Sequence, residues 1–99
     1  MSEPMPVWVE ETLRITGWEA RAKHVINVLR HGEACVDESF IKWADETDNA
    51  ADALEVADLC LWSTLVHNQP QAKQLEALCD RLKTKIERKW QRAQPKVIA

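Results

Sequence analysis

Apolar residues recur every three or four positions in the last quarter of the chain, between residues 70 and 93. With about 3.6 residues to the turn, they all fall on one side of a helix. Pro70 stands where a first-turn proline is tolerated, and Pro95 cannot continue a helix. The pattern predicts a long amphipathic C-terminal helix that packs against the rest of the protein through Leu75, Leu78, Cys79, Leu82, Ile86, Trp90 and Ala93.

A second helix is predicted from about residue 18 to residue 31. Its apolar positions follow the spacing i, i+4, i+7 and i+11, which is typical of one buried stripe. Thr16 and Glu19 have the residue types and spacing of a capping box, and Gly32 stands where a left-handed residue usually ends a helix. The stripe consists of Trp18, Ala22, Val25 and Leu29.

Three further helices complete the predicted fold. Residues 6–15 form a short one, and Asp37 is a good N-cap for another that runs to about residue 46. Residues 50–67 are polar on one side at first and apolar nearly all round from Leu59 onward, which indicates a buried central helix. We therefore expect one all-α domain over residues 1–99, a compact four- or five-helix bundle whose ends, 1–5 and 95–99, are flexible.

The composition agrees with this fold and indicates where in the cell the protein is expected. The chain has 99 residues, two glycines and no tyrosine, which favours helices over sheets. No segment approaches 18 consecutive apolar residues, so we predict no membrane contact. Three cysteines without a CxxC pair do not suggest a disulfide framework. A cytoplasmic location is the corresponding prediction.

The sequence shows no catalytic or metal-binding signature. Its only glycines, Gly17 and Gly32, cannot form a glycine-rich phosphate loop. Cys60 and His67 are seven residues apart, which is about 10 Å along a helix and too far for two ligands of one zinc ion. We predict a protein that is not an enzyme and that needs no cofactor and no metal.

Charge is strongly segregated along the chain. Residues 33–58 contain nine acidic residues and one lysine, whereas residues 80–99 contain seven basic residues and two acidic ones. The acidic segment precedes an apolar stretch that contains Trp62. An acidic row that leads into a tryptophan predicts a protein-binding surface for a basic partner, because charges steer association and tryptophan is enriched at binding hot spots.

The principal hypothesis is therefore a small adaptor or inhibitor that binds another protein. Its size and charge are typical of accessory factors of mobile elements that block nucleic-acid-handling machines, an association that carries no structural argument. The predicted acidic binding residues are Asp45, Asp48, Asp52, Glu55 and Asp58, with Trp43 and Trp62 as apolar anchors.

Two alternatives concern the C-terminal helix. Its row of cations could bind nucleic acid, although domains of that class are usually basic and this chain has a net charge of −3. Its length also suggests that the far end extends past the bundle and packs against a second copy in a homodimer. The basic row consists of Arg81, Lys85, Arg88, Lys89 and Arg92.

Overall fold

The computed structural model describes residues 3–33, 36–67 and 69–93, and for 64–67, 69–70 and 93 it describes the backbone alone. Within these ranges the chain forms five α-helices and no strand, which confirms the predicted all-α fold. The helices are α1 (Val7–Arg14), α2 (Trp18–Arg30), α3 (Glu38–Glu46), α4 (Ala50–His67) and α5 (Gln69–Ala93).

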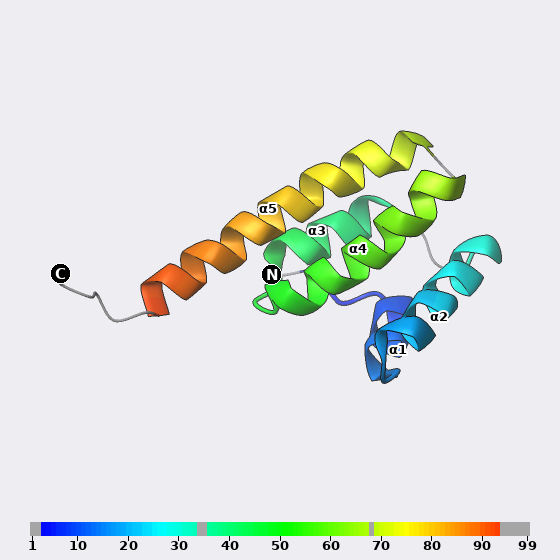
Figure 1. The fold of residues 1–99 in the computed structure, drawn as a ribbon, viewed down its shortest axis with the longest axis horizontal. Coiled ribbons are helices and arrows are strands. Elements are labelled where there is room, and N and C mark those ends of the chain that lie inside the picture. The colour runs from blue at the N-terminus through cyan, green and yellow to red at the C-terminus, as the bar shows by residue number, and fades with distance from the viewer. Residues whose placement is uncertain (1–2, 34–35, 68, 94–99) are drawn as a thin grey trace.

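The central position predicted for residues 50–67 is confirmed, because α4 contacts each of the other four helices. The longest helix, α5, runs back along α4 in the opposite direction and also packs on α3 (Figure 1). The α1–α2 pair covers another side of α4. The C-terminal end of α5 extends beyond α3 and α4 (Figure 1), within a molecule that measures 53 × 30 × 28 Å.

The core is built around Phe40 of α3. The ring centroid of Phe40 lies 5.1 Å from that of Trp8 in α1 and 6.0 Å from that of Trp43 in the same helix. The predicted stripe of α5 reaches this core, because Leu75, Leu78, Cys79 and Leu82 are all buried. Ile86 is only half-buried and Trp90 is 61 % exposed, so the predicted packing of the stripe is wrong at Trp90. The side chain of Ala93 lies outside the described residues.

Asp37 and Gly32 act at the helix ends as predicted. The backbone N–H of Phe40 donates to Oδ1 of Asp37 over 3.0 Å, so Asp37 is the N-cap of α3. Gly32 has the positive φ of 72° that favours glycine directly after a helix. The capping box at Thr16 is wrong: α2 begins at Trp18, Gly17 takes the N-cap position with a φ of 97°, and no side chain caps this end.

The prediction that Trp18 is buried is also wrong. The predicted stripe of α2 buries Ala22 and Val25, but the Trp18 residue is 62 % exposed. Trp18 lies in the first turn of its helix, and Arg21, almost one turn later, meets Glu55 of α4 at 2.7 Å. Periodicity gave the correct side of the helix but not the point along it at which packing starts.

Most of the predicted flexible ends, residues 1–2 and 95–99, lie outside the described residues. In the part of the chain that the structure describes, no helix has both the length and the apolar character needed to span a membrane.

Candidate protein-binding surfaces

The five predicted acidic residues do not form one continuous surface. Asp45 accepts two hydrogen bonds of 3.0 Å each from Nε and Nη2 of Arg81, a residue of the predicted basic row. This paired, fork-like geometry is the strongest form of an arginine–carboxylate contact. Hydrogen bonding to Asp45 raises the pKa of Arg81 above its usual value. Residues from the two competing predicted sites therefore bind each other.

Lys85 is engaged in the same region. Its Nζ donates to the backbone carbonyl oxygens of Asp45, at 3.2 Å, and of Thr47, at 2.8 Å. The last carbonyl groups of a helix lack partners within the helix, and a cation there also opposes the negative end of the helix dipole. Lys85 thus caps the C-terminal end of α3, and together with Arg81 it attaches α3 to α5.

Glu55 is bound within the protein as well. Its Oε2 accepts from Nη1 of Arg21 over 2.7 Å, and the two side chains are 33 % and 21 % exposed, respectively. Arg21 also donates from Nε to the carbonyl of Ile15 over 2.6 Å and from Nη2 to that of Leu13 over 3.0 Å. One guanidinium therefore joins the end of α1, the start of α2 and the middle of α4.

Asp52 and Asp48 lie nearer the start of α4. Asp52 accepts a 2.6 Å hydrogen bond from the side-chain amide of Asn49. Asp48 is exposed and lines a hollow of about 460 Å³ together with Lys85, Lys89 and Arg92. With Asp45 and Glu46, these two acids gather at the junction of α3 and α4, which we call the acidic corner (Asp45, Glu46, Asp48 and Asp52).

Asp58 lies on the side of α4 that faces α5. Its Oδ1 accepts from the thiol of Cys79 over 3.3 Å. Burial, and then this hydrogen bond, raise the pKa of Cys79 to about 12; burial, and then the proximity of Cys79, raise that of Cys60 to about 12. Both thiols therefore remain protonated at neutral pH, which argues against their acting as nucleophiles.

Trp43 and Trp62 have opposite surroundings. Trp43 is only 4 % exposed and packs in the core, so it is not available as an anchor. Trp62 is 53 % exposed. Glu55, Asp58 and Trp62 follow at i, i+3 and i+7, so the three side chains share one strip of α4. We call this strip the α4 outer strip (Glu55, Asp58 and Trp62).

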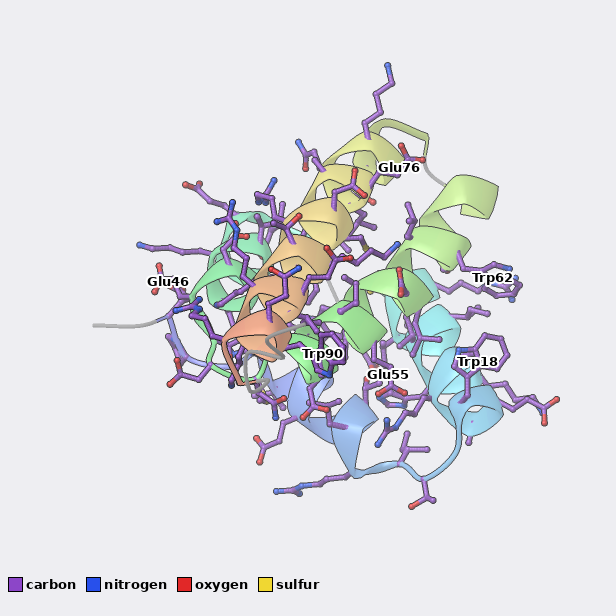
Figure 2. The ribbon with its side chains drawn as sticks, turned by 60° about the vertical axis from the view of Figure 1, so that its left-hand side comes forward. Trp18, Glu46, Glu55, Trp62, Glu76 and Trp90 are labelled. Carbon is purple, nitrogen blue, oxygen red and sulfur yellow. The ribbon has the colours of Figure 1, made fainter. Side chains whose placement is uncertain are left out.

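A second tryptophan lies on the same side of the molecule. Figure 2 shows Trp18 of α2 and Trp62 of α4 projecting in the same direction, with Glu55 lying inward of them in this view. The periodicity of α2 predicted a buried Trp18, which concealed its place on this surface. The sequence offers one weak signal that Trp18 is exposed, which is its place directly after Gly17 in the first turn of the helix. Of the three exposed tryptophans among the described residues, two therefore lie on this side of the molecule.

The outer end of the basic row has a different environment from its inner end. Every described side chain from Glu87 to Arg92 is exposed, including Trp90 at 61 %. Arg88 and Arg92 share a second hollow, of about 430 Å³, with Asp80, Arg81, Thr84 and Lys85. Among the described residues, Arg88, Lys89 and Arg92 have no carboxylate oxygen within 4.0 Å. These cations remain available for contact.

No protein-family model, curated protein or solved structure matches this chain. Within the residues that the structure describes, no three His, Cys, Asp or Glu side chains gather in a way that could hold a metal ion.

Proposed function

We propose that the protein is a small non-enzymatic binding module, an adaptor or inhibitor, that holds a basic protein against the α4 outer strip. The observation that carries this proposal is the exposure of Trp62 directly beside Asp58, one helical turn earlier. A tryptophan buries about 150–250 Å² when fully packed. Leaving half of that area in water forgoes roughly 2–3 kcal/mol, which a bound partner would recover.

Charge gives this surface its selectivity. Asp58 is exposed on the strip, one turn before Trp62. Glu55 adds a second carboxylate, oriented by Arg21. Acidic groups beside an apolar anchor attract basic partners and repel acidic ones. Proteins with basic grooves, including those that handle nucleic acids in the cytoplasm, fit this description.

The test compares Trp62→Ala and Asp58→Lys with the wild type in quantitative affinity capture from cell lysate. Glu33→Lys is the matched control, because Glu33 is exposed and lies outside the strip. We expect basic proteins that the wild type and the control capture and that both strip variants lose. With the captured protein purified, Asp58→Lys should lower the association rate more at 50 mM than at 500 mM salt. Equal capture by all four proteins would refute the proposal.

A further inference from the structure

The apolar stripe of α5 continues past the point where the bundle ends. Leu78 and Leu82 are at most 1 % exposed, Ile86 is half-buried, and Trp90 is 61 % exposed, although the four residues lie on the same side of the helix. We call residues 86–92 the arm. Figure 1 shows this part of α5, in orange and red, extending beyond the neighbouring helices. The arm thus presents a large apolar side chain that is mostly exposed.

The arm is also the part of α5 with available positive charge. Arg88, Lys89 and Arg92 have no carboxylate within 4.0 Å among the described residues. The acidic corner lies beside the base of the arm, since Lys85 contacts the carbonyls of Asp45 and Thr47. Asp48 and Lys89 line the same hollow of about 460 Å³ without forming an ion pair. Within one chain, Asp48 therefore lies close to Lys89 and Arg92 but forms no ion pair with either of them.

From this arrangement we propose that the arm binds the acidic corner of a second copy of this chain, and that the arm of the second copy binds the acidic corner of the first. Each copy carries both the arm and the corner, so a two-fold axis satisfies both at once and closes the assembly as a dimer. In this dimer Lys89 and Arg92 of one copy would meet Glu46 and Asp48 of the other, while Trp90, on the other flank of the arm, would pack against a different part of the partner. Two reciprocal contacts also provide twice the buried area of one.

Nucleic acid fits the arm less well than a second copy of this chain does. Arg88 and Arg92 are each two residues from Trp90, about 200° round the helix, so the aromatic ring and these cations face opposite ways. A single-strand site usually combines cations with a stacking aromatic group on the same surface. Glu46, Asp48 and Asp52, which have no cationic partner within 4.0 Å among the described residues, would repel phosphates at the base of the arm, whereas they attract the arm of another copy.

The experiment is a charge exchange in trans, measured by sedimentation equilibrium at 50 mM salt. The arm-reversed chain carries Lys89→Glu and Arg92→Glu, and the corner-reversed chain carries Glu46→Lys and Asp48→Lys. Each alone should dimerise at least tenfold more weakly than the wild type. An equimolar mixture should recover a dimer with one copy of each, because both contacts then join opposite charges. Only contacts between molecules can produce this rescue.

Trp90→Ala provides a second variant that does not depend on charge, with Trp18→Ala as its control, since both residues are exposed to a similar extent. Only Trp90→Ala should weaken the dimer. A wild type that stays monomeric at 100 µM would overturn the proposal, as would a dimer that the mixture fails to restore. A monomer that retards duplex DNA in a salt-sensitive way, and loses this with arm reversal, would assign the arm to nucleic acid instead. None of these outcomes bears on capture by the α4 outer strip.

Discussion

Replacing Arg21 with alanine should destabilise the protein more than any other single change of an exposed or half-buried charge. Its guanidinium makes three hydrogen bonds of 2.6–3.0 Å, to the carbonyls of Ile15 and Leu13 and to Glu55. Hydrogen bonds that involve a charged group contribute about 1.5–3 kcal/mol each when they are shielded from water. Because Arg21 is 21 % exposed, water can replace part of this, and we expect a loss of about 2–4 kcal/mol.

The assay is urea denaturation followed by circular dichroism at 222 nm. For a chain of this size the dependence on urea is about 1–1.5 kcal/mol per molar, so the midpoint should fall by about 1.3–4 M with no change in slope. Arg14→Ala is the matched control, because Arg14 pairs with Glu10 at 2.8 Å but its side chain is 75 % exposed. Exposed pairs of this kind contribute at most about 0.5 kcal/mol.

A double-mutant cycle with Glu55→Gln separates the ion pair from the two carbonyl contacts. The coupling free energy between Arg21 and Glu55 should be about 1–2 kcal/mol, with the rest of the loss persisting in the absence of Glu55. If Arg21→Ala costs no more than Arg14→Ala, the description of Arg21 as the link between α1, α2 and α4 is wrong. Because Glu55 also binds Arg21, reversing its charge would disturb the fold as well as the surface. Asp58 is therefore the residue to reverse in binding experiments.

Two further predictions concern the core. Leu82→Ala should lower the free energy of unfolding by about 2–5 kcal/mol, because Leu82 is 1 % exposed, and a urea midpoint like that of the wild type would contradict its placement. The pKa values of Cys60 and Cys79 are about 12 in the folded protein, against 9.0 for an unburied thiol. Below pH 9 both thiols are protonated in the folded and the unfolded chain, so the full stability of the folded state is present there. Stability should fall as pH rises from 9 to 12, by up to about 1.4 kcal/mol per thiol and pH unit, since only the unfolded chain ionises there. Alkaline melting curves check this, and a Cys60→Ala variant with unchanged pH dependence would refute it.

The secondary structure was predictable from the sequence because its signals are local. The i, i+3, i+4 spacing of Leu75 to Ile86 specifies a helix and its buried side within a few residues. Asp37 and Gly32 act on the backbone groups next to them, and both were identified correctly. Thr16 failed because the positive φ of Gly17 moved the helix start by one residue, a shift that residue types alone do not reveal.

The candidate site was less predictable because it depends on contacts between distant segments. Arg81 and Asp45 are 36 positions apart, and Arg21 and Glu55 are 34 apart. A linear reading therefore counted charges as available that the fold had already paired. Trp62 shows the converse: its helix is apolar nearly all round in sequence, yet the tryptophan is 53 % exposed, because neighbours cover α4 on only some of its sides.

The basic row of α5 illustrates how one periodic pattern can serve two purposes. Its inner members, Arg81 and Lys85, bind Asp45 and the last carbonyls of α3, so they hold that helix in place. Its outer members, Arg88 to Arg92, lie beyond the packed core and have no described acidic partner within 4.0 Å. A charge reversal at Arg81 should therefore act on stability, whereas one at Arg92 should act on association. Periodicity makes these positions equivalent, and the length of α5 relative to its neighbours makes them different.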